Sequence, residues 1–159
     1  MTALGRVYTL APDGSVRPNS RKSTKARLLV GGEQSEGLYT WRHYLCEEQI
    51  YLHRHDKEDE NVYVLSGEPT VRVGDQYYKL SPGSFIYMPR EVPHAISSDA
   101  PWEGLSVSSP GGIFDGLMDE ITELFAAGTP TPEQLGAALT RAGITVLEGK
   151  WTGEAPIVQ

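Results

Sequence analysis

The spacing of apolar residues changes once along the chain, near residue 110. From residue 26 to that point, short runs of Val, Ile, Leu and Tyr alternate with turn residues every eight to twelve positions or so, as in a β-sandwich or barrel. Gly74-Asp75 is predicted to form the turn of a hairpin within 71–77, because it can take the positive φ angles that such turns need. The predicted strands are 26–30, 38–46, 49–55, 61–66, 69–73, 76–80, 84–88, 94–98 and 103–108.

Beyond residue 110 the apolar residues recur at steps of three and four. Residues 112–127 carry one apolar stripe, with acidic residues on the other faces, which predicts an amphipathic helix. A second helix is predicted to start after Thr131, where Gln134 can complete a capping box, and to end at Gly143. The apolar run 144–147 is consistent with one further strand. The fold class predicted from these patterns is therefore all-β, with two C-terminal helices.

The chain of 159 residues has the length of one domain. We divide it into an N-terminal arm (1–25), a β domain (26–110), and a helical extension (111–159) packed on that domain or on a partner. Residues 11–25 of the arm are polar and predicted to form a loose arm or loop. No apolar run is long enough to span a membrane, and the N-terminus lacks the apolar stretch of a secretory signal. Cys46, the single cysteine, cannot form an intrachain disulfide, so a cytoplasmic location is expected.

The net charge of −7 argues against a general nucleic-acid-binding protein, and no membrane association is expected. The charge is unevenly distributed. Residues 1–30 contain six basic residues and one acid, Asp13, a net charge of +5, so the rest of the chain carries −12. A basic arm could contact RNA or an anionic lipid, but packing against the acidic body or a partner subunit is the favoured interpretation.

Candidate chemistry is concentrated in the histidines, of which the chain has four: His43, His53, His55 and His94. His53 and His55 are two residues apart on a predicted strand, so both side chains point to the same face. Glu60 follows five residues later. Imidazole nitrogens combined with one carboxylate suit a divalent transition metal, and three or four protein ligands leave positions for substrate, water or dioxygen.

Two spaced patterns connect these residues. The first, His-x-His-x4-Glu-x6-Gly, comprises His53, His55, Glu60 and Gly67, and the second comprises Gly83, Pro89 and His94. These stretches resemble the two motifs of the cupins, a family of small jelly-roll β-barrel proteins, over about residues 26–110. The resemblance implies a cupin-type barrel that holds one metal ion through His53, His55, Glu60 and His94.

Three motif positions differ from the family pattern. Glu47, Glu91 and Ser98 stand where the motifs have Gly, Gly and Asn. These are turn positions, so all four ligand positions implied by the resemblance are present.

The layout is similar to that of small bacterial cupins of the quercetin 2,3-dioxygenase-like group. This likeness implies an oxygenase that acts on a flavonol or another enolisable aromatic molecule, with Glu60 as both ligand and base. The implied metal is Fe, Ni, Co, Mn, Cu or Zn, the implied partners are a small-molecule substrate and dioxygen, and a homodimer is expected. Two alternatives stay open: a metal-dependent cyclase, isomerase or decarboxylase acting on a polyketide-like substrate, and a non-catalytic small-ligand-binding cupin.

Other residues allow two interpretations each. His43 is either a further ligand or pocket base, or a rim or core histidine, because the pattern does not fix which face of its strand points inward. Tyr39, Trp41, Phe85, Tyr87 and Trp102 either line an aromatic cavity or form an ordinary barrel core. The acidic run 56–60 is predicted to be a solvated loop from which Glu60 turns inward. The helix at 112–127 could cover the barrel mouth or seal a dimer, and some of each is the favoured interpretation.

Overall fold

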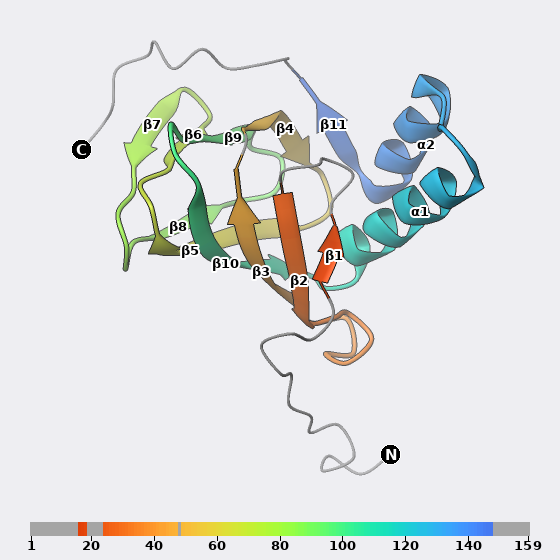
Figure 1. Ribbon diagram of the computed structural model, residues 1–159, viewed down its shortest axis with the longest axis horizontal. Coiled ribbons are helices and arrows are strands. Elements are labelled where there is room, and N and C mark those ends of the chain that lie inside the picture. The colour runs from red at the N-terminus through yellow and green to blue at the C-terminus, as the bar shows by residue number, and fades with distance from the viewer. Residues whose placement is uncertain (1–15, 19–23, 48, 148–159) are drawn as a thin grey trace.

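The computed structural model describes residues 16–18, 24–47 and 49–147. Its strands form two antiparallel sheets, with strand orders β1-β2-β3-β10-β5-β8 and β11-β4-β9-β6-β7 (Figure 1). The elements are β1 (Val16–Pro18), β2 (Thr24–Val30), β3 (Thr40–Cys46), β4 (Ile50–His55), β5 (Asp59–Ser66), β6 (Thr70–Val73), β7 (Gln76–Lys79), β8 (Phe85–Met88), β9 (His94–Ser97), β10 (Trp102–Ser109), α1 (Ile113–Ala127), α2 (Pro132–Ala142) and β11 (Ile144–Val146). The predicted mainly β fold with two C-terminal helices is confirmed.

The sheets enclose an apolar core in a jelly-roll-like arrangement. Each predicted strand from 26–30 to 103–108 is present, because period-two alternation places one set of side chains against the opposite sheet. The core residues are Cys46, Val62, Val64, Val71, Leu80, Ile86, Met88, Ile96 and Trp102.

The interior changes from apolar to polar along the strands. On β3 and β10, alternate side chains point inward and are buried. Cys46 lies opposite Trp102 at the apolar end of this strand pair. At the other end Ser108 lies between Thr40 of β3 and Glu60 of β5. Glu60 is therefore positioned where the barrel interior is polar.

Turns keep the backbone geometry that the two sequence motifs require. Gly67 and Gly83 have φ angles of 80° and 91°, which favour glycine. At Gly67 a Cβ would also lie 2.7 Å from the Trp102 Cβ. Glu91, one of the residues that departs from the motif, has φ of 67°, and its backbone N–H donates to the His55 carbonyl at 2.7 Å. The turn before β9 therefore keeps a left-handed residue although its side chain is not Gly.

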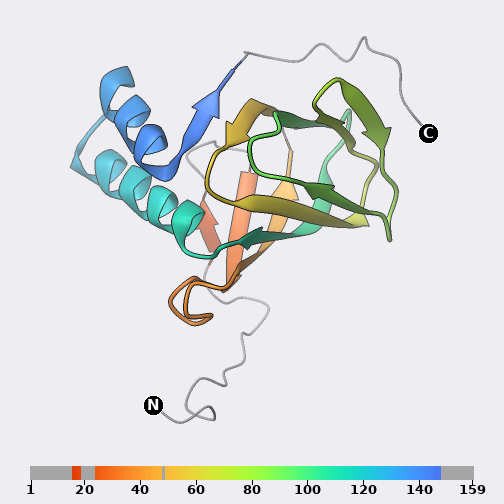
Figure 2. The same ribbon diagram turned by 180° about the vertical axis from the view of Figure 1, so that it is seen from behind.

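The C-terminal segment forms a second, smaller core beside the sheets. Helices α1 and α2 lie side by side (Figure 2), and α2 begins with the predicted capping box between Thr131 and Gln134 and ends at Gly143, with φ of 72°. None of the described helices is long and apolar enough to cross a membrane. The buried residues of this core are Leu117, Ile121, Ala138, Ala142 and Ile144.

Strand β11 returns the chain to the sheet that carries three of the histidines, and it pairs with the strand that holds two of them. It pairs with β4, placing Ile144 opposite His55 and Val146 opposite His53. The strand β4 is thus held between β11 on one side and β9 on the other. This pairing fixes the backbone from which both histidines project.

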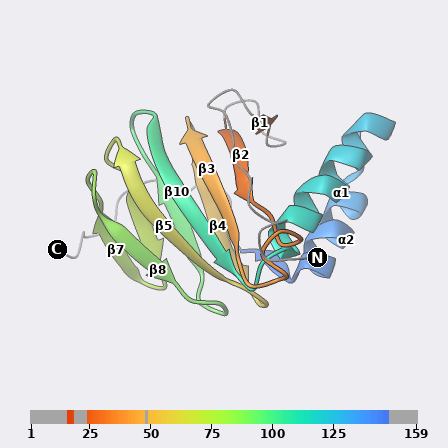
Figure 3. The same cartoon turned by 90° about the horizontal axis from the view of Figure 1, so that it is seen from below.

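The described part of the N-terminal arm differs from the prediction of a loose loop. Residues Val16–Pro18 form β1, which pairs with β2, and β2 starts at Thr24, before the predicted boundary. Arm residues outside 16–18 and 24–25 lie outside the described residues. Figure 3 shows β2, β3, β10 and β5 side by side in one sheet, with the helices at its end.

Candidate metal centre

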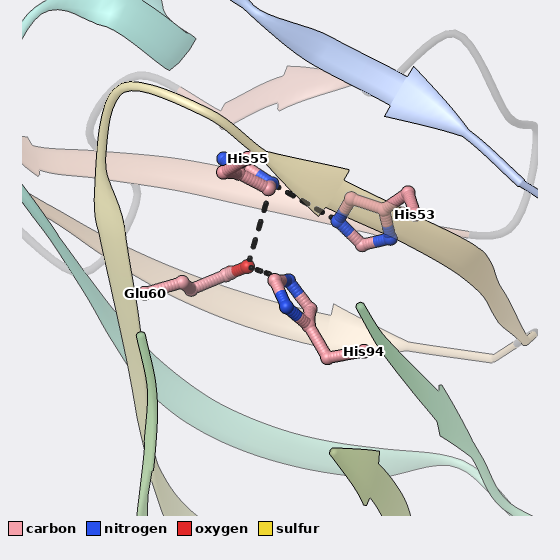
Figure 4. Close-up of side chains that lie close together, drawn as sticks. All are labelled: His53, His55, Glu60 and His94. Carbon is pink, nitrogen blue, oxygen red and sulfur yellow. Dashed lines mark hydrogen bonds and ion pairs between the residues drawn. The ribbon is translucent and has the colours of Figure 1, made fainter. Parts of the chain in front are cut away.

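Three strands bring the predicted ligands together. His53 and His55 project from β4, Glu60 from β5 and His94 from β9 (Figure 4). One potential ligand atom from each lies within 4.8 Å of all the others. The His53 and His55 Nε2 atoms are 3.0 Å apart, and Glu60 Oε2 lies 3.8 Å from the His55 Nε2 and 3.4 Å from the His94 Nε2. These four side chains could hold a metal ion.

Each imidazole is oriented through its other nitrogen. The Nδ1 of His53 donates to the Tyr51 carbonyl at 2.7 Å, and that of His94 to the Val92 carbonyl at 3.0 Å. The Nδ1 of His55 lies 2.9 Å from a carboxylate oxygen of Glu58. Because a carbonyl or carboxylate oxygen can only accept, each neutral ring carries its proton on Nδ1. All three Nε2 lone pairs are therefore directed into the site.

This convergence suits a cation. Two imidazole lone pairs 3.0 Å apart repel each other unless a proton or a metal ion lies between them. The buried His94 Nε2 has no hydrogen-bond partner among the described residues, although the Glu60 carboxylate is close. The donor set, three imidazoles and one carboxylate, is also one that divalent transition metals bind well.

The electrostatic environment keeps the site ready for such an ion. Burial, reinforced by the neighbouring His94 and His55 rings, lowers the pKa of His53 to about 3, so this ring is neutral. Burial opposes ionisation of Glu60, but the His94 and His55 rings, when protonated, outweigh it and hold the pKa of Glu60 well below its usual range. The pKa of His55 is raised, because Glu58 and Glu60 together outweigh the cost of burial.

The charges around the site do not cancel. Among the described residues, three carboxylates that are buried or partly buried (Glu58, Glu60 and Asp115) surround the site and its polar wall, and Arg42 is the buried cation beside them. The excess is two negative charges when the histidines are neutral. A divalent cation would compensate this excess, since an uncompensated buried charge is costly.

The comparisons with known proteins agree with this architecture. A family model described as a cupin domain matches residues 44–108, which include all four clustered residues. The chain contains a cupin domain. No curated protein is significantly similar to the full sequence.

Solved structures resemble the cupin domain at low sequence identity. KdgF from Halomonas sp. is 14% identical with a TM-score of 0.56, covering 65% of this chain and 94% of that one. An RmlC-like cupin from Shewanella frigidimarina is 17% identical with a TM-score of 0.57, covering 65% and 90%. The DMSP lyase DddQ from Ruegeria pomeroyi is 19% identical with a TM-score of 0.51, covering 60% and 55%. At these identities the likeness shows the fold, and this fold includes enzymes.

The wall of the site in the cupin domain is polar. The Ser106 hydroxyl donates to Glu60 Oε1 at 3.2 Å, and Arg42 donates to the Ser108 hydroxyl at 3.2 Å. Tyr44, on the same inward face of β3, is a neutral phenol, because burial raises its pKa to about 12. These side chains offer hydrogen bonds to an oxygen-bearing ligand.

Glu58 is the residue at the site that the sequence analysis missed. The acidic run 56–60 was predicted to be solvated apart from Glu60, but the Glu58 side chain is buried, with 1% of its surface exposed. The prediction is wrong here because the short link between β4 and β5 turns Glu58 under His55. Its place three residues after a candidate ligand is a signal that could have identified it.

His43 does not join the cluster. It lies on the opposite face of β3 from Arg42 and Tyr44, and its Nε2 contacts Glu103 of β10 at 2.5 Å. The alternative in which His43 is a further ligand is therefore wrong. Inward-pointing positions on this strand are the even-numbered ones, from Thr40 to Cys46.

Both interpretations of the aromatic residues, a cavity lining and an ordinary barrel core, are wrong for four of the five. Four of the five residues lie on the outside of the molecule, exposed by 38% to 61%: Tyr39, Trp41, Phe85 and Tyr87. Trp102 is buried in the main core. The sequence shows which of these residues share a strand face, but only pairing with the second sheet decides which face is inside.

The first turn of α1 lies beside the site. The centroids of the Phe114 and His55 rings are 6.2 Å apart. The Arg42 guanidinium lies over the Phe114 ring, 4.3 Å from its centroid. Asp115 holds this turn in place by accepting from Arg42 at 2.6 Å and from the Thr40 hydroxyl at 2.9 Å. This geometry favours the covering role for the helix at 112–127.

Proposed function

We propose that this protein is a metal-dependent cupin enzyme that removes a proton from a small enolisable substrate. The observation that supports the proposal is the convergence of three Nε2 lone pairs, from His53, His55 and His94, beside the Glu60 carboxylate. The metal ligands in this proposal are these three histidines and Glu60. A site with three or four protein ligands leaves room for a substrate oxygen.

Glu60 is the base in this proposal. Its lowered pKa keeps it ionised at neutral pH, so its oxygens carry lone pairs that can accept a hydrogen bond or a proton. Ser106 donates to Oε1, which leaves Oε2 directed at the imidazoles, where a substrate hydroxyl would bind. A bound divalent cation would lower the pKa of a coordinated enol or phenol and stabilise the oxyanion. Proton transfer to Oε2 then proceeds at neutral pH.

The first candidate reaction is oxygenation of the deprotonated substrate, a flavonol or related enol, as the resemblance to the quercetin dioxygenase-like group implies. Its requirements are dioxygen and a substrate that becomes electron-rich when Glu60 takes the proton. Phe114 and α1 would exclude bulk water from one side of the site.

The second candidate is a reaction without oxygen: isomerisation, cyclisation or decarboxylation of an enolisable substrate. The polar wall of Arg42, Tyr44, Ser106 and Ser108 favours it, because such side chains bind and stabilise oxygen-centred charge. With four of the five expected aromatics on the outside, the structure also favours a compact, oxygen-rich substrate over a large planar one.

The test combines metal loading with oxygen measurement. Protein reconstituted with Fe, Ni, Co or Mn is incubated with a flavonol and with a small aliphatic 1,3-diketone, in an oxygen electrode and under strict anaerobiosis. Oxygen uptake matched to substrate loss supports the oxygenase, and turnover that is unchanged without oxygen supports the second candidate. Glu60→Gln should lower turnover at least a hundredfold, within the range of lost acid–base catalysis, whereas His43→Gln should not.

A non-catalytic role makes a different prediction. A cupin that only holds a metal would retain it stoichiometrically, yet neither substrate would be consumed and solvent deuterium would not enter the diketone at a Glu60-dependent rate. That combination contradicts the proposal, because proton removal is its central step.

We also propose that the cupin is a homodimer, formed through the outward face of the larger sheet. On this outer aromatic face Trp41, Tyr63, Phe85 and Tyr87 are exposed by 38% to 61%, and Leu105 and Val107 of β10 lie between them in register. At about 200 Å² per aromatic side chain, their exposed parts amount to roughly 400 Å², about half of what each partner buries in a stable complex.

A further inference from the structure

One imidazole of the site differs from the other two in what orients it. His53 and His94 each donate Nδ1–H to the carbonyl of the residue two positions earlier. Such a partner is a backbone group, so the contact does not depend on which side chain occupies that position. His55 instead donates to the Glu58 side chain at 2.9 Å. This contact depends on one particular residue.

Burial of the Glu58 carboxylate is unfavourable in free energy, so its contact with His55 needs an explanation. Its side chain is 1% exposed, and Oε2 is buried without a hydrogen-bond partner among the described residues. Taking a carboxylate out of water is unfavourable unless other interactions compensate for the lost hydration. The neighbouring acids Asp56 and Asp59 of the same run remain at least partly exposed. The fold thus selects this one carboxylate for burial.

An ordinary buried ion pair does not account for Glu58. Arg42 is the buried cation nearby and attracts Glu58 electrostatically. The side-chain hydrogen bonds of Arg42, however, involve Asp115, Ser108 and Tyr44, and its guanidinium carbon lies over the Phe114 ring. Among the described residues, the hydrogen bond of Glu58 goes to His55.

We propose that Glu58 is a positioning residue that fixes the His55 tautomer and makes the His55 Nε2 a stronger metal donor than those of His53 and His94. A carboxylate behind a ligating histidine holds the ring orientation and increases its basicity, and loss of such a partner costs about 10- to 100-fold in metal affinity. This inference rests on the proposed metal site. It adds Glu58 to that site and predicts that the His55 Nε2 is the strongest of the three imidazole donors.

The experiment measures Co²⁺ affinity by competition with a chelator, and the visible Co²⁺ absorption spectrum, in four full-length proteins. Glu58→Gln keeps an acceptor oxygen of the same size and removes the charge, and Glu58→Ala removes both. Asp56→Asn is the matched control, because it removes one negative charge from the same segment at a side chain that is 40% exposed. Affinity should fall about tenfold in Glu58→Gln and about 100-fold in Glu58→Ala, with a changed spectrum, and should stay within about twofold in Asp56→Asn.

A second readout needs no metal. In ¹⁵N spectra of the histidine side chains, His55 of the wild type should be the Nδ1–H tautomer at a pH where the ring is neutral. It should become a tautomer mixture in Glu58→Ala, while His53 and His94 remain unchanged. Glu58→Gln should keep the tautomer, which separates orientation from charge even if Glu58→Ala folds poorly.

The outcomes are distinguishable. Unchanged Co²⁺ affinity in both Glu58 variants overturns the inference, and so does an equal loss in Glu58→Gln and Asp56→Asn, since that would reflect charge alone. If the folded wild type itself binds no Co²⁺, Ni²⁺, Mn²⁺ or Fe²⁺, the proposed function fails, and the tautomer experiment then decides on Glu58 separately.

Discussion

At the scale of single residues, the candidate centre depends on which nitrogen of each ring carries the proton. Tyr51 and Val92 supply backbone carbonyls to His53 and His94, and Glu58 supplies a carboxylate to His55. When the rings are neutral, the same arrangement on all three leaves three Nε2 lone pairs and no N–H in the centre. Such a centre is suited to a cation.

Removal of one ring tests this arrangement. The protein as isolated should contain near-stoichiometric divalent metal, and His53→Ala should lose most of it, because two imidazoles and a carboxylate bind a divalent ion far less tightly. Elemental analysis of purified protein is the measurement. His43→Ala is the matched control, since His43 contacts Glu103 outside the site and its loss should leave the metal content unchanged. Equal metal loss in both variants would contradict the assignment.

Another residue-scale prediction concerns the turn before β9. Glu91 has a left-handed backbone, which costs an L-residue roughly 1–2 kcal/mol, partly offset on replacement by the chain entropy of Gly. Glu91→Gly should therefore raise the free energy of unfolding by about 0.5–1 kcal/mol. Urea denaturation measures it. Glu33→Gly, at an exposed position without a positive φ angle, should be neutral or destabilising, and a gain of the same size there would refute this explanation.

At the scale of elements, the C-terminal unit is anchored to the sheets at both ends. The start of α1 is held by Asp115, which accepts from Arg42 and Thr40. After α2, strand β11 pairs with β4, next to the histidines. The helices are thus part of the structure around the site.

Loss of the Asp115 contacts that anchor the start of α1 should lower the free energy of unfolding substantially. Asp115→Asn leaves the buried Arg42 guanidinium without its carboxylate partner, and removal of one member of a buried pair typically costs about 3–5 kcal/mol. Thermal and urea unfolding should show this loss, together with weaker protection of α1 in hydrogen exchange. Glu123→Gln, an exposed change on the same helix, should alter stability by less than about 0.5 kcal/mol. A similar small effect of Asp115→Asn would show that Arg42 is compensated in another way.

At the scale of the whole molecule, the two faces of the larger sheet have opposite characters. Its inner face contributes Glu60 and the polar wall, and its outer face exposes aromatic side chains. Patches of several hundred Å² of apolar surface are uncommon on monomers and are typical of interaction sites. This outer aromatic face is the surface through which we propose that the homodimer forms.

Light scattering coupled to gel filtration tests this assignment. The wild type should elute at twice the mass of one chain, and Tyr63→Lys should convert it to a monomer, because a buried unpaired charge opposes association. Phe125→Lys, on the exposed side of α1, is the matched control and should remain dimeric. If Phe125→Lys is a monomer and Tyr63→Lys remains a dimer, the interface lies on helix α1, which is the alternative that the sequence left open.

The sequence by itself determined the elements other than β1 and the four side chains of the candidate centre. Period-two and helical spacing located these strands and both helices, since these periods are local properties of the backbone. The capping residues Thr131 and Gln134 fixed where α2 begins. Motif spacing also selected the four side chains that cluster, because three imidazoles and one carboxylate at those intervals are rare by chance.

Only the tertiary structure decided which side of each strand is inside. His43 and the outer aromatics alternate as regularly as the inward residues do, and only the second sheet covers one face of them. The burial of Glu58 was likewise decided in three dimensions, because an acidic run has no periodicity and the short link between β4 and β5 sets its direction. Local pattern specifies the faces, and packing chooses between them.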